Sequence, residues 1–191
     1  MNRNRLVKMV TAAMLIAVSI AIPMFSPFKI ILEPASFTLA SHVAIFIAMF
    51  ISPAVAISVA AGATLGFLLG GFPIVIVLRA ASHLIFVAIG AILLQKRPQL
   101  MENKFKLIGF AFIISVIHAA SEVLVVIPFY FGSSMPEGYY ARGFLLTVIG
   151  LVGVGTVVHS LVDFAIARAV WAAVRKASGK SIVAGSTVGN S

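Results

Sequence analysis

Cysteine is absent from this 191-residue chain, and charged side chains make up only 10% of it. Without cysteine the protein has no disulfides and no thiolate metal sites, so the sequence carries no sign of its redox compartment. A soluble domain is about half apolar and about a quarter charged, whereas 61% of these residues are hydrophobic. The composition therefore excludes an ordinary soluble domain and indicates a membrane protein.

The motifs of the common nucleotide-binding and hydrolytic sites are missing as well. The chain has no GxxxxGK[ST] phosphate loop, no HExxH zinc motif and no GxSxG nucleophile elbow. Of its five acidic residues, Glu122 and Asp163 are the two within apolar runs. Two carboxylates are few for a proton-driven antiporter or an intramembrane aspartyl protease. We therefore expect no enzyme, no cofactor and no metal.

Six apolar runs make up most of the chain. They cover residues 6–25, 39–51, 54–71, 74–94, 106–130 and 143–171. A helix needs about 20 residues to cross the hydrocarbon core, so the second and third runs predict short or tilted helices. The pattern predicts an all-α integral membrane protein of the cell membrane, with a single six-helix bundle over 1–176. The small, polar segment 177–191 predicts a disordered tail.

Basic residues predict how the bundle is oriented. The net charge of +9 follows the positive-inside pattern, in which Lys and Arg gather in cytoplasmic segments, and it need not indicate a nucleic-acid partner. Both termini are therefore expected in the cytoplasm. Eleven of the 14 basic residues then lie on that side: Arg3, Arg5, Lys8, Lys96, Arg97, Lys104, Lys106, Arg168, Arg175, Lys176 and Lys180.

Three of the apolar runs each contain a pair of polar residues spaced i,i+4. The pairs are Arg79 with His83, His118 with Glu122, and His159 with Asp163. This spacing puts both members of a pair on one face of a helix. Ionisable residues within a membrane usually face the bundle interior and mark a functional site. The expected depths predict that the first two pairs meet near the outer face and that the third does not join them.

Each candidate also has a structural interpretation. Glu122 could simply neutralise Arg79 as a buried ion pair, which is compatible with a binding role because such a pair can open for an anion. His159 and Asp163 could be hydrogen-bonded helix neighbours. His42, at the start of the second helix, could be an interfacial residue or a pocket residue.

Loops and small residues supply the remaining candidates. Two external loops, 26–38 and 131–142, are longer than tight connections need, and longer loops often act as lids. Tyr139 and Tyr140, in the second loop, could contact a ligand or sit at the membrane interface. Gly62, Gly66 and Gly70 recur every four residues, a spacing typical of close helix packing.

These features together resemble a known family. The chain has the size, charge and helix number of the substrate-binding S-components of energy-coupling factor (ECF) vitamin transporters, and an AxxxA edge, Ala13-Met-Leu-Ile-Ala17, in its first helix. The stretches PASFTLASHVAIFIAMFISP (34–53) and GFLLGGFPIVIVLRAASHLIF (66–86) are similar to the small-vitamin S-components of Gram-positive bacteria. The resemblance covers about residues 6–171.

The resemblance implies a division of labour. An S-component captures a vitamin near the outer face, in a pocket formed by helices four to six and the first external loop. It then associates through its first helix with a membrane-embedded coupling subunit and two cytoplasmic ATPases, and is thought to topple in the membrane. By this resemblance, the pocket would include Arg79, His83, His118 and Glu122, with His42 and Tyr139 or Tyr140 beside them. Ala13 and Ala17 would face the coupling subunit.

Arg79 suggests the chemistry of the ligand, because a guanidinium pairs well with a carboxylate. Few aromatic residues lie deep in helices four to six, which disfavours a large stacked ring system. A small carboxylated vitamin is therefore expected, niacin slightly ahead of pantothenate. Two other functions remain open: a self-contained proton-coupled transporter using Glu122 and Asp163, or a structural membrane subunit without a ligand.

Overall fold

Helices make up most of the residues that the computed structural model describes, namely 3–32, 35–135 and 137–177. Each of the six apolar runs contains a helix. The six α-helices are α1 (Arg3–Phe25), α2 (Val43–Ile51), α3 (Pro53–Leu69), α4 (Ile74–Lys96), α5 (Lys104–Phe131) and α6 (Gly155–Ala177). A π-helix, η3 (Leu145–Val154), leads directly into α6, and short 3₁₀ turns lie at Pro98–Met101 (η1) and Glu137–Tyr139 (η2).

Loop 26–38, which the sequence predicts to be external, contains a hairpin that the sequence did not indicate. Strands β1 (Lys29–Leu32) and β2 (Ala35–Thr38) pair antiparallel, with Lys29 opposite Thr38. The chain after β2 then turns sharply through Ala40, whose φ of 68° lies in the left-handed region that non-glycine residues seldom adopt. The predicted lid is therefore a structured element that leads into α2.

Helix length supports a membrane protein. Within the described residues, four helical segments are long and apolar enough to cross a membrane: α1, α4, α5 and the continuous segment Leu145–Ala177. The nine residues of α2 rise about 14 Å, well short of the roughly 30 Å hydrocarbon core. The count of six spans stays a prediction. The predicted disorder of the tail concerns residues 178–191, which lie outside the described residues.

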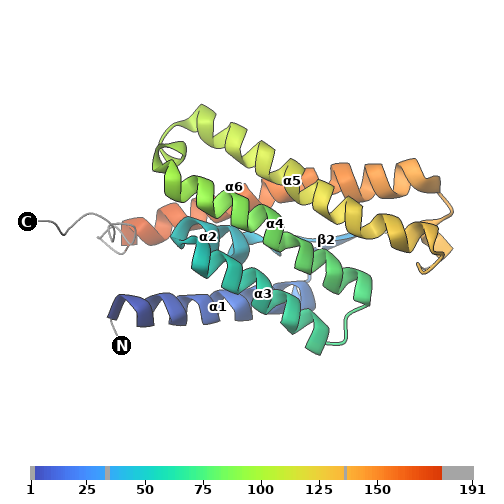
Figure 1. Cartoon of the computed structure of the whole chain (residues 1–191), viewed down its shortest axis with the longest axis horizontal. Coiled ribbons are helices and arrows are strands. Elements are labelled where there is room, and N and C mark those ends of the chain that lie inside the picture. Colours follow the sequence, from blue (N-terminus) through green and yellow to red (C-terminus); the bar gives the residue numbers. More distant parts are fainter. Residues whose placement is uncertain (1–2, 33–34, 136, 178–191) are drawn as a thin grey trace, which may run out of the picture.

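The helix ends and their connections lie in two groups, one at each end of the bundle (Figure 1). The start of α1, the connection from α4 to α5, and the end of α6 lie together at one end. This end carries most of the basic residues named above. The hairpin and the connection from α3 to α4 extend toward the opposite end, so the candidate lid and the basic clusters are on different sides of the molecule.

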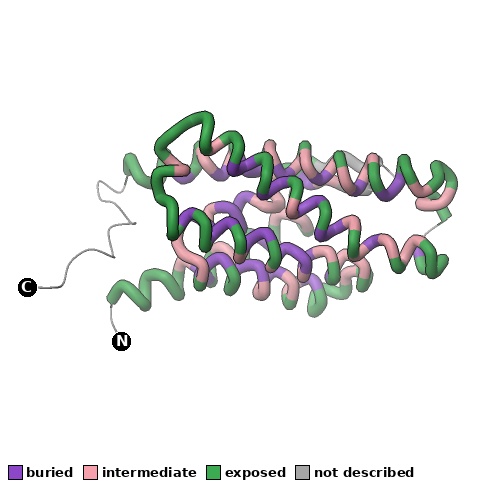
Figure 2. The backbone as a smooth tube through the Cα atoms, turned by 45° about the horizontal axis from the view of Figure 1, so that its top comes forward, coloured by how far each residue is buried: buried purple, intermediate pink, exposed green. Residues whose placement is uncertain are grey.

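The core is built around α2. Seven of its nine residues are buried, and Phe46 and Ala48 are fully so. Burial runs along the inward faces of the surrounding helices, while the outward faces are exposed (Figure 2). Many of these exposed residues are large and apolar, such as Leu69 at 88% and Phe105 at 83%. An apolar outer surface on this scale fits a lipid environment.

Glycine brings α1 and α3 into close contact, as the spacing in α3 predicted. A Cβ atom at Gly62 would lie 2.6 Å from Cδ1 of Ile16, and one at Gly66 would overlap the side chain of Ile20. A larger residue at these positions would have to displace the side chain of Ile16 or Ile20 on α1. The small-residue face of α3 therefore sets the distance between the two helices.

Candidate functional site

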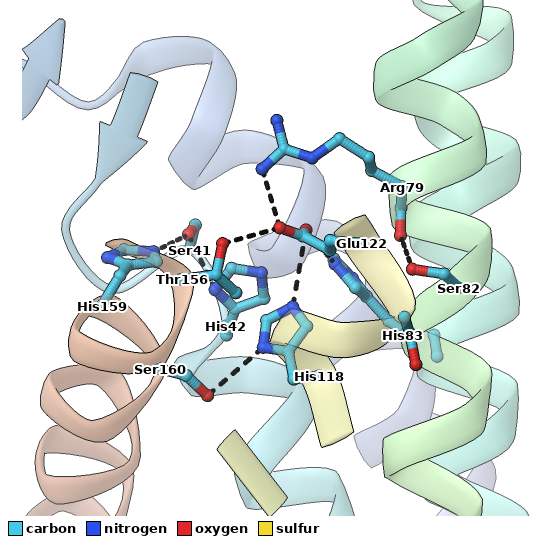
Figure 3. Close-up of polar contacts among 12 residues, drawn as sticks. Ser41, His42, Arg79, Ser82, His83, His118, Glu122, Thr156, His159 and Ser160 are labelled. Carbon is cyan, nitrogen blue, oxygen red and sulfur yellow. Dashed lines mark hydrogen bonds and ion pairs between the residues drawn. The ribbon is translucent and has the colours of Figure 1, made fainter. Parts of the chain in front are cut away.

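Glu122 is the centre of a polar network that joins α4, α5 and α6 (Figure 3). Arg79 Nη2 donates to Oε2 of Glu122 at 2.8 Å, and the Thr156 hydroxyl donates to the same oxygen at 2.8 Å. The Oε1 atom lies 3.1 Å from His83 Nε2. The carboxylate is 3% exposed, so its charge is compensated within the protein, as a buried charge requires.

His118 lies beneath this carboxylate, fully buried. Its Nδ1 atom is 3.2 Å from the hydroxyl of Ser160 on α6. Its Nε2 atom faces Glu122 Oε1 at 3.5 Å, a contact that does not meet hydrogen-bond geometry, so this nitrogen is buried without a hydrogen-bond partner. A buried polar atom of this kind is unusual and calls for an explanation.

Asp163 is the centre of a second network, which anchors the turn after the hairpin. Its Oδ1 atom accepts the backbone N–H of Ala40 at 2.8 Å, and Oδ2 accepts the backbone N–H of His42 at 2.9 Å. His42 Nδ1 and His159 Nε2 also lie 3.2 Å and 3.3 Å from Oδ2. Asp163 therefore fixes both the strained turn at Ala40 and the ring of His42.

The third polar pair joins the other two, so the prediction that it would not was wrong. His42 connects them: its ring centroid is 4.8 Å from that of His83, 4.7 Å from His118 and 5.1 Å from His159. The prediction counted depth from the start of the sixth apolar run. The segment Leu145–Ala177 has 33 residues, roughly 50 Å of helix, so its first turns extend beyond the level at which a normal span begins.

A cavity of about 140 Å³ opens above these networks. The lining residues come from the hairpin and the turn after it, from all six α-helices and from the α3–α4 connection: Ser19, Pro23, Phe37, Thr38, Ser41, His42, Ile45, Ala63, Phe67, Phe72, Ile76, Arg79, Ala80, His83, Glu122, Thr156 and His159. The side chain of Arg79 lines the cavity and is 19% exposed, and its buried Nε atom has no hydrogen-bond partner. The cavity thus combines apolar walls with an incompletely paired guanidinium.

The structure brings together most of the residues predicted from the sequence. Arg79, His83, Glu122 and His42 line the cavity, and His118 supports them from below. Tyr139 is absent from the lining and belongs to a separate apolar cluster with Val126 and Val148, as does Tyr140. A ligand contact by either tyrosine stays a prediction.

The AxxxA edge lies away from this site. Ala13 and Ala17 are exposed on α1, while Ala12 and Ser19 on the same helix face inward and are buried. A small-residue edge on an outward face is free to meet another protein. Its predicted role in binding a coupling subunit is compatible with this placement and is not tested by it.

Several residues of the site were not expected from the sequence. Thr156 bonds the central carboxylate, and Ser41 lies 3.0 Å from His159 Nε2. Hydroxyl residues are common in membrane helices, so neither carried a recognisable signal. Phe37 of β2 packs against Gly155, where a Cβ atom would lie 2.6 Å from its ring. A glycine opening a helix beneath an aromatic residue becomes meaningful only once the hairpin is placed.

The groups that line the cavity are suited to binding a small ligand. The cavity offers a guanidinium, imidazoles and hydroxyls, which suit a small polar anion with an aromatic or apolar body. Among the described lining residues, each hydroxyl contact seen for Ser41 and Thr156 is to the site's own side chains.

One curated relative has a long match to the chain. The niacin transporter NiaX of Lactococcus lactis subsp. cremoris (strain MG1363) is 42% identical over 159 residues, which is 83% of this chain and 70% of the relative. No family profile matches the chain, and no solved structure matches it. Identity of this extent across most of both chains establishes common family membership.

Proposed function

This chain belongs to the family of substrate-binding S-components of ECF vitamin transporters, and we propose that it binds nicotinate in the cavity beside Arg79. It is accordingly a multi-pass protein of the cell membrane that takes part in vitamin uptake. The relative's name identifies a niacin transporter, and the observation that carries the proposal here is the guanidinium in the cavity wall.

Arg79 supports a carboxylate ligand for a geometric reason. One terminal nitrogen of its guanidinium bonds Glu122 at 2.8 Å, while the side chain as a whole is 19% exposed and lines the cavity. A charged donor in that position gains a charge-assisted hydrogen bond when a carboxylate enters. His42 and His83 also line the cavity, and an imidazole N–H is a suitable donor to the ring nitrogen of nicotinate.

The size of the cavity favours nicotinate over pantothenate. Pockets for drug-sized molecules measure roughly 300–1,000 Å³, and this one measures about 140 Å³. A single six-membered ring bearing one carboxylate suits that volume, whereas pantothenate is a longer, branched chain with several hydroxyl and amide groups. The apolar side chains of Phe37, Phe67 and Ile76 in the lining suit the faces of a flat ring.

The remaining parts of the proposal concern topology and partners. We propose six spans with both termini in the cytoplasm, which the clustering of basic residues at one end of the bundle supports. A membrane-embedded coupling subunit would dock on the exposed Ala13–Ala17 edge, and two ATPases would supply the energy. The absence of a phosphate loop from this chain is consistent with ATP hydrolysis by separate subunits.

A binding experiment with matched arginine variants tests the ligand assignment. The full chain, purified in detergent without partners, is titrated with nicotinate as wild type, as Arg79→Gln and as Arg142→Gln. We expect Arg79→Gln to weaken binding at least about a hundredfold, because a charge-assisted contact worth about 3 kcal/mol is lost. Arg142 is exposed and outside the cavity lining, so Arg142→Gln should bind as wild type. Equal binding by Arg79→Gln would refute the assignment.

The proton-coupled alternative makes a different prediction. It requires Glu122 and Asp163 to exchange protons during transport, and uptake that follows a proton gradient without any ATPase. Asp163 holds two backbone N–H groups of the turn after the hairpin, which favours an anchoring role. Uptake by the chain alone in proteoliposomes, driven by a pH gradient, would support that alternative over ours.

A further inference from the structure

The site contains more ligating groups than nicotinate needs. Nicotinate offers one carboxylate and one ring nitrogen, whereas all four histidines of the chain and both carboxylates of its apolar runs converge here. Imidazole and carboxylate groups are also the ligands that divalent transition ions prefer. These additional imidazole and carboxylate groups suggest that the site binds a second species besides nicotinate.

Four of these groups are arranged around one point. His42, His83, His118 and Glu122 each offer one ligand atom, and these atoms all lie within 4.8 Å of one another. Neighbouring ligand atoms on a tetrahedral zinc ion lie roughly 3.3 Å apart, close to the 3.1 Å and 3.5 Å that separate Glu122 Oε1 from His83 Nε2 and His118 Nε2.

The unpartnered nitrogen of His118 is an independent sign. Its Nε2 atom is fully buried, has no hydrogen-bond partner and faces the Glu122 carboxylate. His118 Nδ1 is 3.2 Å from the Ser160 hydroxyl, a contact that orients the ring in the way metal-binding histidines are usually oriented. A metal ion between His118 and Glu122 would give this nitrogen the partner it lacks.

We propose that His42, His83, His118 and Glu122 bind one divalent transition-metal ion, which accompanies the carboxylate ligand into the cavity. The class of ion follows from the ligands, because three imidazoles and a carboxylate suit zinc, nickel or cobalt far better than magnesium or calcium. Four protein ligands fill a tetrahedral zinc site, and zinc can expand to five-coordinate to take a further oxygen ligand from the cavity side.

Charge balance gives the ion a role. With its imidazoles neutral, the site holds one positive charge, on Arg79, and two negative charges, on Glu122 and Asp163. An anionic ligand would raise this buried negative excess from one to two, which is costly in a low-dielectric interior. A divalent cation reverses the excess to one positive charge, which a single carboxylate then neutralises.

This inference rests on the proposed function, because nicotinate is the anionic ligand whose charge the metal ion would balance. Protonation of two histidines would also balance the negative charges of Glu122, Asp163 and the bound carboxylate. The competing sources of positive charge are therefore a metal ion and protons taken from solution. The titratable groups facing the cluster are Arg79 and His83 on α4, Glu122 and His118 on α5, His159 and Asp163 on α6, His42, and Tyr139 on η2, which interacts with Arg79. The experiment must separate the two sources.

Metal binding is measured first, without nicotinate. The full chain is purified with an affinity tag that contains no histidine, stripped with a chelator, and titrated with Zn²⁺ and with Co²⁺, whose visible absorption reports tetrahedral nitrogen and oxygen ligands. We expect one equivalent to bind, and His83→Gln and His118→Gln to weaken binding at least about tenfold. His159→Gln is the matched control and should retain it. Absence of binding by the wild type would overturn the proposal, as would an equal loss in His159→Gln.

Nicotinate is then titrated into the stripped and the Zn²⁺-loaded protein, in buffers of different ionisation enthalpy. At least tenfold tighter binding to the loaded protein supports the inference. Equally tight binding to the stripped protein, with proton uptake revealed by the buffer dependence, overturns it and leaves the proposed function intact. Zn²⁺ binding at the cluster, with no nicotinate binding in either state, supports the metal site and overturns the proposed function.

Discussion

Asp163 anchors the turn that closes the cavity, and replacing it with asparagine isolates that role. The side chain is fully buried and accepts the backbone N–H groups of Ala40 and His42 at 2.8 Å and 2.9 Å. Asparagine has nearly the same shape, so Asp163→Asn removes charge and one acceptor without opening a void. Its amide NH₂ would face a donor, which leaves one of the two backbone N–H groups without a partner.

The expected cost follows from these bonds. A hydrogen bond to a charged group contributes about 1.5–3 kcal/mol, and an orphaned buried donor costs about 1–3 kcal/mol. Ala40 adds strain of about 1–2 kcal/mol through its left-handed backbone, and this strain opposes closure. We therefore expect the closed turn to be roughly 2–4 kcal/mol less stable in Asp163→Asn than in the wild type. Because affinity scales with the fraction of closed protein, we expect nicotinate binding to weaken at least about tenfold.

Two measurements check this prediction. Titration with nicotinate gives the change in affinity, and hydrogen exchange gives the opening of the turn through the amides of Ala40 and His42. Ser115→Ala is the control, because Ser115 is buried on α5 and its hydroxyl has no hydrogen-bond partner. It should leave both readouts unchanged. Wild-type affinity in Asp163→Asn, together with unchanged protection of these amides, would refute the anchoring role.

Three further substitutions test the hairpin, the helix packing and the outer edge. In Gly155→Ala the new Cβ would lie 2.6 Å from the ring of Phe37 and would displace the hairpin. Nicotinate should then bind severalfold more weakly, with an unchanged unfolding temperature. Unchanged affinity would count against the hairpin as a lid. Gly62→Leu would collide with Ile16 on α1 and should cost about 1–3 kcal/mol of stability, measured by thermal unfolding in detergent. Ala13→Trp, on the exposed edge, should spare nicotinate binding and block uptake by cells that supply the coupling subunit and ATPases; normal uptake would remove this edge from the partner interface.

The contact between the first two polar pairs could be predicted because two local signals agree. Arg79 and His83 share one helix face, as do His118 and Glu122, and intramembrane charges seek each other across helices. The structure places Arg79 against Glu122 at 2.8 Å. The sequence also left the structural and binding roles of this pair open, and the unpartnered Nε of Arg79 is compatible with both.

The place of Asp163 could not be predicted in the same way. Its depth depends on where the sixth helix begins, and the π-helix η3 lengthens that segment to 33 residues. Its partners lie in a turn more than 120 positions earlier in the chain. Both the length of this segment and the distant partners of Asp163 depend on the tertiary structure. The i,i+4 spacing to His159 indicated only a local contact within one helix.

The hairpin escaped prediction because its strands are short. Lys29–Leu32 and Ala35–Thr38 have four residues each, too few for apolar and polar residues to reveal a period of two. The same holds for the hydroxyl of Thr156, whose bond to Glu122 depends on the packing of α5 against α6. Sequence patterns identified the charged members of the site, and packing determines which neutral groups complete it.

The most direct test of the account compares nicotinate with nicotinamide, by calorimetric titration of the isolated full chain, Zn²⁺-loaded and stripped. The two ligands share ring and size and differ in the charge that Arg79 recognises. We predict tight binding of nicotinate by at least one form of the protein, and binding of nicotinamide weaker by at least about a hundredfold. Equal affinity for both, or no binding of nicotinate to either form, would contradict the central claim that this cavity selects a small carboxylated ring.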